Sequence, residues 1–196
     1  MYRFDKFSKT PLSLQKIYMN TNHLASIYGT ESDVNNCSFY HKVGACKHGS
    51  GCSKSHIKPI FSNIVLLSNL LSTTKDIPIE KCFEDIFCEL SIKYGQIEDM
   101  IIAANRSSHL KGSVYVKFVD DRSAEAAVND LNNRFYDDKP IFTELSPVDN
   151  LRDAVCRSFT QGRCNRPDTC NFVHTELISR SVTANLYNRQ RVYFKH

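Results

Sequence analysis

Hydrophobic residues change their spacing along the middle of the chain, from strand-like to helix-like and back. The apolar run IVLLSNLL at residues 64–71 predicts a strand, and KGSVYVKF at residues 111–118 alternates as a half-buried strand does. After Pro78 the apolar residues recur every three or four positions, which predicts a helix that begins beside the proline. These helical positions are Ile79, Cys82, Phe83, Ile86, Phe87 and Leu90.

Three more segments complete the pattern. Residues 94–104, YGQIEDMIIAA, predict a turn that leads into a strand, and KPIFTEL at residues 139–145 predicts the last strand. Between them, a second helix is marked by Ala124, Ala127, Val128 and Leu131. The resulting βαββαβ order is that of a split-βαβ sandwich, so we expect an α+β fold for residues 61–151.

The KGSVYVKF segment matches the RNP1 strand of an RNA recognition motif, with two departures from it. RNP1 has an aromatic residue at its third position, where this chain has Ser113, and of the base-stacking aromatic residues of RNP1 only Tyr115 remains. In the strand equivalent to RNP2, Leu66 occupies the stacking position. We therefore expect this sheet to stack RNA bases poorly.

Two cysteine clusters with nearly the same spacing flank the predicted sandwich. The first is Cys37-x8-Cys46-x5-Cys52-x3-His56, and the second is Cys156-x7-Cys164-x5-Cys170-x3-His174. Cys3His is a standard ligand set for tetrahedral structural zinc. Neither segment has enough apolar residues to fold alone, so metal binding would supply folding free energy. The sequence thus predicts two zinc fingers, each with one Zn²⁺.

The cysteines could instead form disulfides, and His41 or His48 could compete with His56 as the metal ligand. The cellular compartment argues against the first alternative, and the repeated spacing argues against the second. The 196-residue chain has no apolar run of 18 residues and no secretory signal at its start, so we expect an intracellular protein with reduced thiols and no membrane span. His56 matches His174, whereas His48 is opposite Arg166, so we expect His41 and His48 on the surface. Cys82 and Cys88 match neither cluster and are expected in the core.

Charge divides the chain in the same way. Residues 37–60 have a net charge of +4 and no acidic residue, residues 61–151 have a net charge of −6, and residues 152–174 have a net charge of +2. The net charge of the whole chain is +4. Basic flanks around an acidic centre indicate that the fingers, and not the sandwich, bind a polyanion.

Aromatic and basic side chains interleave in both fingers, a composition suited to stacking unpaired bases and neutralising phosphate. The alternative is that the aromatic rings only cover the metal. The candidate RNA-binding residues of this kind are Phe39, Tyr40, Lys42, Lys47, Lys54, Arg157, Phe159, Arg163 and Phe172.

The acidic sandwich suggests a protein partner instead. The outward face of its first helix carries Glu80, Glu84, Asp85 and Glu89, and the loop after the second helix contains Arg134, Phe135 and Tyr136. A cation and two aromatic rings beside an acidic helix favour a protein-binding site over a merely solvated helix face.

Several segments together resemble the small subunit of the U2 snRNP auxiliary factor (U2AF), over about residues 22–190. They are HLASIYGTE, NCSFYHKVGACKHGSGCSKSHIKP, GSVYVKF, DLNNRFY, ELSPVDNLRDAVCR and CNFVH. The resemblance implies a nuclear pre-mRNA splicing factor whose fingers recognise the AG at the 3′ end of introns. It also implies that the centre is a U2AF homology motif, which binds a tryptophan-containing peptide of the large subunit.

The resemblance assigns roles to individual positions. Arg134 and Tyr136 fill an Arg-x-Phe loop, Glu84, Asp85 and Glu89 face basic residues of the ligand, and Ser53 and Ser158 lie near RNA. The family usually has Trp at Phe135, and a smaller ring would lose about 1 kcal/mol or more of buried contact. The chain ends without an Arg-Ser tail.

The expected organisation has five parts: an extension with a short helix at 1–36, finger one at 37–60, the sandwich at 61–151, finger two at 152–176 and a basic segment at 177–196. Leu12, Leu14 and Ile17 suggest the short helix. The sequence offers no nucleophile–base pair or phosphate loop, so we expect no enzyme. The alternatives are a tandem-finger regulator of AU-rich mRNA and an adaptor with purely structural fingers.

Overall fold

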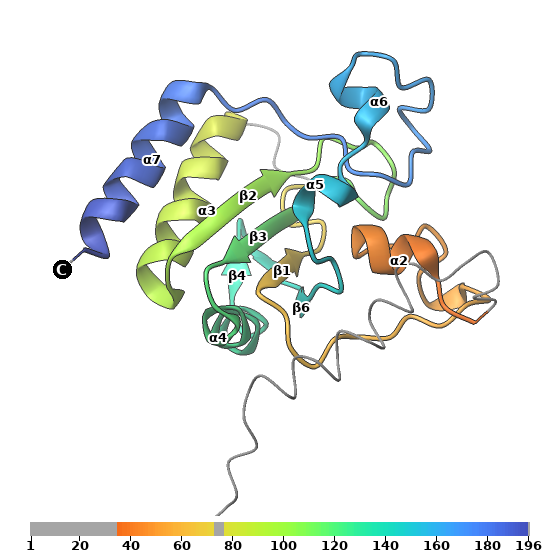
Figure 1. The fold of residues 1–196 in the computed structure, drawn as a ribbon, viewed down its shortest axis with the longest axis horizontal. Helices are drawn as coiled ribbons and strands as arrows, with labels where there is room; N and C mark the ends of the chain where they lie inside the picture. The colour runs from red at the N-terminus through yellow and green to blue at the C-terminus, as the bar shows by residue number, and fades with distance from the viewer. Residues whose placement is uncertain (1–34, 73–76, 196) are drawn as a thin grey trace, which may run out of the picture.

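A four-stranded antiparallel sheet forms the centre of the computed structural model, which describes residues 35–72 and 77–195 (Figure 1). The strands are β1 (Ile64–Leu67), β2 (Ile97–Ile102), β3 (Val114–Phe118) and β6 (Thr143–Leu145), in the order β2-β3-β1-β6. Helix α3 (Ile79–Tyr94) connects β1 to β2, and α4 (Asp121–Leu131) follows β3. The predicted α+β sandwich with βαββαβ order is confirmed.

The two helices cover one face of the sheet. Alternate strand residues such as Val65, Val116 and Phe118 point toward them and are almost fully buried. Helix α4 begins where the Asp120 carboxylate accepts a hydrogen bond from the Ser123 backbone N–H at 2.9 Å, as an N-cap does. The periodic apolar residues of α3 and α4 therefore face this core, as their spacing predicts.

The opposite face of the sheet is also buried. Ile64, Leu66 and Tyr115 point away from α3 and α4, and their exposed fractions are 0%, 2% and 0%. They pack against residues from both cysteine-rich segments, from the short helix α5 (Leu151–Ala154) and from the chain just before it, namely Val43, Val148, Leu151, Ala154 and Val173. Figure 1 shows α5 and the helix α2 (Ser38–Val43) beside the strands. The flanking segments thus complete the core.

Two glycines allow the backbone to approach a neighbouring segment closely. Gly112 has φ of +64°, and a Cβ there would lie 2.5 Å from the backbone of Leu71 and Ser72. Gly44 ends α2 with φ of +77°, and a Cβ there would lie 2.6 Å from the Ser146 hydroxyl. The left-handed conformation and the lack of space both favour glycine at these positions.

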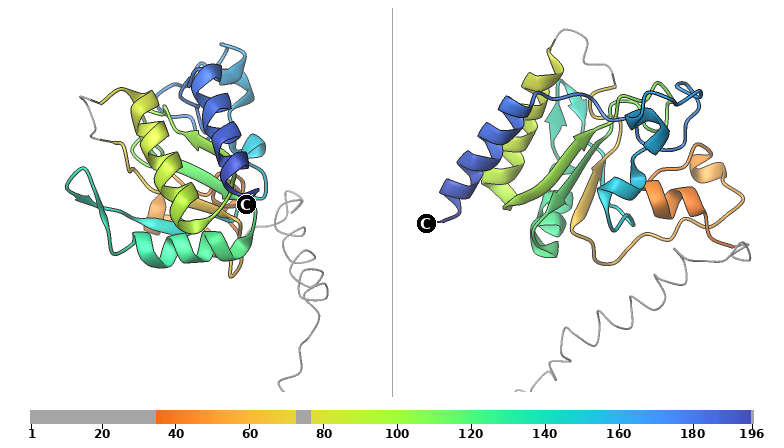
Figure 2. Two further views of the ribbon diagram at one scale, coloured as in Figure 1. Left: turned by 90° about the vertical axis from the view of Figure 1, so that its left-hand side faces the viewer. Right: turned by 45° about the horizontal axis from the view of Figure 1, so that its top comes forward.

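A C-terminal helix, α7 (Arg180–Tyr193), lies alongside α3 (Figure 2). The sequence predicts only a basic segment at residues 177–196, and no helix. Leu186 is buried against the core, and the Tyr187 ring meets the Phe87 ring edge-on with their centroids 4.9 Å apart. The helix buries only a narrow apolar stripe and exposes many polar residues, which is why periodicity did not reveal it.

The structure corrects three further details. The strand expected at 64–71 ends at Leu67, because the chain turns through Asn69 with φ of +53°. The strand expected at 139–145 divides into β5 (Lys139–Pro140), which pairs with β4 (Phe135–Tyr136) in a hairpin, and β6. Cys82 is buried as expected, but Cys88 is exposed because it lies on the outer face of α3.

The expected short helix around Leu12, Leu14 and Ile17 lies outside the described residues. Within the described residues, no helix has the length and apolar character needed to cross a membrane.

Gln190 connects α7 to the edge of the sheet and supplies the first prediction. Its side-chain oxygen accepts hydrogen bonds from the Ser91 hydroxyl (2.8 Å) and the Ile97 N–H (2.9 Å), and its amide donates to the Ile97 carbonyl (2.8 Å). We expect Gln190→Ala to lower the free energy of unfolding by roughly 2–4 kcal/mol, because it leaves these buried groups without partners. Urea denaturation would measure this, with the exposed Asn185→Ala as control; equal loss in both would contradict it.

Candidate functional site

The first cysteine cluster is assembled around the short helix α2. Cys37 immediately precedes α2, Gly44 ends the helix, and the chain then returns Cys46 toward Cys37. Cys52 and His56 follow a single 3-10 turn at Gly49–Gly51. The four potential ligand atoms all lie within 4.8 Å of one another, and the sulfurs of Cys46 and Cys52 are 3.8 Å apart.

The second cluster repeats this arrangement. Helix α6 (Arg157–Thr160) follows Cys156 as α2 follows Cys37. The ligand atoms again lie within 4.8 Å of one another, and the sulfurs of Cys156 and Cys170 are 3.8 Å apart. The four cysteine and histidine positions expected in each finger are therefore brought together, and His48 lies outside the first set.

The geometry of both clusters fits a tetrahedral metal. Four ligands around a metal with metal–sulfur bonds of about 2.3 Å would hold their sulfurs about 3.8 Å apart, which is the separation observed in each cluster. A disulfide would require about 2.05 Å. The Nε2 atoms of His56 and His174 are buried, and neither has a hydrogen-bond partner among the described residues. Each cluster can therefore hold a metal ion.

At three of the ligand positions, Cys52, Cys164 and His174, the surroundings favour the protonation state that binds a metal, which is the thiolate for cysteine and the neutral imidazole for histidine. The backbone N–H groups of Lys54 and Arg166 lower the pKa of the Cys52 and Cys164 thiols, respectively. Burial lowers the pKa of His174, which favours the neutral imidazole that binds metals. Burial instead raises the pKa of Cys170 to about 11, so metal binding there must displace a proton.

An aromatic ring stacks on the histidine of each cluster. The Tyr40 ring lies parallel to that of His56 with centroids 4.5 Å apart, and Phe159 lies parallel to His174 at 4.0 Å. Tyr40 is only 5% exposed, so its ring orients the imidazole and offers little surface to a base. The prediction that His41 lies on the surface is wrong: it is buried with Tyr40 and Val43, because α2 packs against the rest of the protein.

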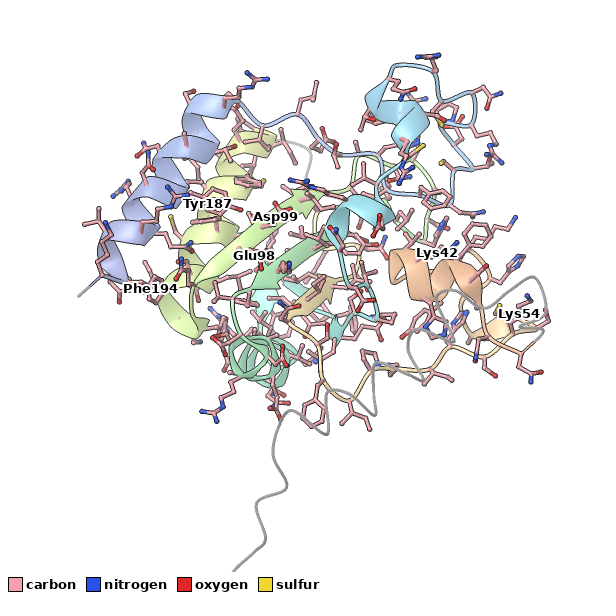
Figure 3. All side chains as sticks on the ribbon, in the orientation of Figure 1. Lys42, Lys54, Glu98, Asp99, Tyr187 and Phe194 are labelled. Carbon is pink, nitrogen blue, oxygen red and sulfur yellow. The ribbon has the colours of Figure 1, made fainter. Side chains whose placement is uncertain are left out.

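The two fingers meet through their aromatic residues. The Phe39 and Phe172 rings are in edge-to-face contact with centroids 6.1 Å apart, and Phe39 remains 36% exposed. The hydroxyl and cationic residues considered for RNA binding are exposed in the two fingers: Lys42, Lys47, Ser53, Lys54, Arg157, Ser158 and Arg163. Lys42 and Lys54 lie at the opposite end of the molecule from Phe194 of the C-terminal segment (Figure 3).

The sheet face that carries the RNP-like residues is covered by the fingers. Tyr115, in the RNP1-like strand, is fully buried, and its hydroxyl donates a hydrogen bond of 2.7 Å to the Val43 carbonyl in α2. Leu66 is buried beside it. The bases of a nucleic acid cannot reach this face of the sheet. This is a second reason to expect weak base stacking there, and the sequence alone did not reveal it.

The acidic helix α3 contacts the loop after α4. The Arg134 guanidinium forms a 2.7 Å ion pair with Glu89 and donates to the Tyr94 hydroxyl at 3.2 Å. Asp85 is exposed on the same helix, and Glu84 is partly covered. Glu80 differs from the other acids because it accepts the Ser179 N–H at 2.9 Å and so supports the start of α7.

The two aromatic residues of this loop lie in different environments. Phe135 is 69% exposed. Tyr136 packs at the edge of the core beside α3, where burial raises the pKa of its phenol. The loop therefore places the exposed ring of Phe135 next to the packed ring of Tyr136, close to Asp85 and Glu89.

Comparison with known proteins gives concordant findings. The RNA recognition motif family matches residues 82–141. The splicing factor U2af 38 kDa subunit of Drosophila melanogaster is 44% identical over 189 residues, covering 86% of this chain and 72% of that protein. The splicing factor U2AF 23 kDa subunit of Schizosaccharomyces pombe is 43% identical over 185 residues, covering 88% and 85%. The splicing factor U2AF 26 kDa subunit of Homo sapiens is 40% identical over 185 residues, covering 85% and 84%.

The buried Tyr115 hydroxyl provides a test of how firmly the first finger is attached. We expect Tyr115→Phe to lower the free energy of unfolding by about 1–3 kcal/mol, because the Val43 carbonyl loses its buried donor. Urea unfolding followed by circular dichroism would measure the change. Tyr193→Phe, at a ring that is 58% exposed, is the matched control and should be neutral. Identical stabilities for the two variants would show that the hydrogen bond does not secure the finger.

Proposed function

The chain belongs to the family of U2AF small subunits, and we propose that it is an RNA-binding subunit of a pre-mRNA splicing factor. In this proposal the two fingers together recognise the AG dinucleotide at the 3′ end of an intron. The sandwich binds a large U2AF subunit, and the protein acts in the nucleus, where pre-mRNA is spliced.

One observation carries the RNA-binding proposal: the two fingers are in contact with each other, while the sheet face is inaccessible. Phe39 and Phe172 touch across the junction, and exposed cations come from both fingers. Aromatic rings with surrounding cations suit a short single-stranded segment. The net charge of −6 on residues 61–151 repels phosphate, so the RNA is directed to the fingers.

We propose Zn²⁺ as the ion in both clusters. Three thiolates and one imidazole form a soft ligand set that suits zinc, and the observed sulfur separations match its bond lengths. Bound zinc would cross-link each finger and supply folding free energy. Four protein ligands leave no position for a substrate at a tetrahedral ion, which supports a structural and non-enzymatic role.

The partner site is proposed at α3 and the loop that contains Arg134. A peptide with a tryptophan and flanking basic residues complements this surface, because the Asp85 carboxylate is exposed, Glu89 shares its charge with Arg134, and Tyr136 borders the core. Phe135 is exposed and available to insert into the large subunit, although it is smaller than the tryptophan usual in the family.

RNA variants test AG recognition. We expect the purified protein, together with a large subunit, to bind a short RNA ending in UAG roughly tenfold or more tightly than the same RNA ending in UAC, because one lost base contact costs about 1–3 kcal/mol. Fluorescence anisotropy would measure both affinities. Equal binding of UAG, UAC and an AU-rich RNA would favour a general mRNA regulator, and no binding to any RNA would favour an adaptor.

Charge reversal tests the partner site. We expect Asp85→Lys to weaken binding of a synthetic peptide with one tryptophan between basic residues by roughly tenfold, because a local attraction becomes a repulsion. Glu125→Lys, on the exposed side of α4, makes the same change of charge elsewhere and should have little effect. Calorimetry would compare them. Equal affinities in the two variants would place the interface away from α3.

A further inference from the structure

The loop between β2 and β3, residues 103–113, runs between the two fingers (Figure 1). On one side, Arg106 lies 3.7 Å from Asp168 of the second finger. On the other side, Leu110 is fully buried in the same hydrophobic cluster as Val43 of the first finger. This loop belongs to the sandwich in sequence but contacts both metal-binding segments.

Asn105 makes the most specific contacts in this loop. Its side chain is buried, with only 2% of the residue exposed. The side-chain oxygen accepts a hydrogen bond from the backbone N–H of His174 at 2.8 Å, and the side-chain amide donates to the Phe172 carbonyl at 3.0 Å. One amide group therefore holds the backbone of a metal-ligand residue and of an aromatic residue at the finger junction.

Backbone contacts extend the attachment on both sides of Asn105. The Ala104 N–H donates to the His174 carbonyl at 2.6 Å, and Ala103 pairs with Thr175 in an antiparallel bridge. The Glu176 N–H then donates to the Ile102 carbonyl at 2.9 Å. Both backbone groups of His174 are thus bound by the sandwich, and the chain after it lies along the end of β2.

Both fingers also close through their own chain. In the second finger, the Cys156 N–H donates to the Val173 carbonyl at 2.8 Å and the Val173 N–H donates to the Ala154 carbonyl at 2.9 Å. The first finger has the equivalent bonds. The Cys37 N–H donates to the Ser55 carbonyl at 3.0 Å, and the Ser55 N–H donates to the Asn35 carbonyl at 2.7 Å. The segment that leads into His56 is therefore held by the finger's own chain. Tyr115 supports this finger from the sheet, but its hydrogen bond goes to Val43 in α2 and not to the ligand segment.

We infer that Asn105 is a positioning residue for the second metal centre. It fixes the backbone of His174 so that the imidazole meets the three sulfurs, and in the same way it fixes Phe172 at the contact with Phe39. Groups that orient metal ligands from outside the ligand set typically change metal affinity by about 10–100-fold when they are removed. The inference rests on the proposed zinc sites.

Site-resolved thiol protection tests the inference. The zinc-loaded full chain and its Asn105→Ala variant are alkylated with N-ethylmaleimide, and each cysteine is quantified by mass spectrometry over time. We expect the second-finger cysteines of the variant to react roughly tenfold or more faster, because the zinc they share is released more readily. We expect Cys37, Cys46 and Cys52 to react at the wild-type rate. Total zinc, measured by mass spectrometry, should fall toward one equivalent per chain during dialysis against a chelator.

The remaining two cysteines serve as internal references. Cys88 is exposed and should react at the same rate in every sample, whereas Cys82 is 1% exposed and reports global unfolding. Ser108→Ala changes an exposed residue of the same loop and is the matched control. Asn105→Asp keeps the acceptor for the His174 N–H but sets a buried carboxylate against the Phe172 carbonyl, so it too should speed the reaction of the second-finger cysteines.

The outcomes separate the inference from the proposed function. Unchanged protection of the second finger in Asn105→Ala would overturn the inference. Faster reaction of all cysteines, including Cys82, would overturn it too, because Asn105 would then support only the fold. If zinc protects neither finger of the wild-type protein, the proposed zinc sites are wrong, and the inference fails with them.

Discussion

The central sheet is shared between two hydrophobic cores, and the position of both fingers depends on this arrangement. One face of β1 and β3 packs on α3 and α4, and the other packs on residues from the fingers and α5. Each finger is too small to bury much apolar surface alone, so the sheet supplies the support on which α2 and the second finger rest. The contact between Phe39 and Phe172 is possible because both fingers occupy the same face.

This sharing also divides the functions of the molecule. An RNA recognition motif ordinarily offers its sheet to bases, but here the sheet holds the fingers, and Tyr115 is committed to a hydrogen bond with Val43. On the opposite side of the sheet, α3 and the loop that contains Arg134 keep exposed residues, among them Asp85, Glu89 and Phe135. The acidic surface and the basic fingers are thus separated, so a protein partner and an RNA need not compete for the same residues.

The elements with strong local patterns could be predicted from the sequence. Repeated cysteine spacing identified both clusters, and alternating or helical periodicity identified β3 and α3. Helix α7 was missed because it buries little more than Leu186 and Gln190 among polar residues. Asn105 and the burial of His41 were missed for a different reason: both depend on contacts with segments distant in sequence, which leave no local pattern.

The bonds that the sandwich adds to the second finger have a consequence for the order of events during synthesis. Cys37 to His56 leave the ribosome before Tyr115 has been made, so the first finger must stay together for a time without the sheet beneath it. Its bonds between Cys37, Ser55 and Asn35 all lie within the newly made segment. The second finger emerges after the sandwich, so its equivalent bonds between Cys156, Val173 and Ala154 form when Asn105 has already been made. The additional bonds to His174 and Phe172 are therefore available only to the finger that is made after Asn105.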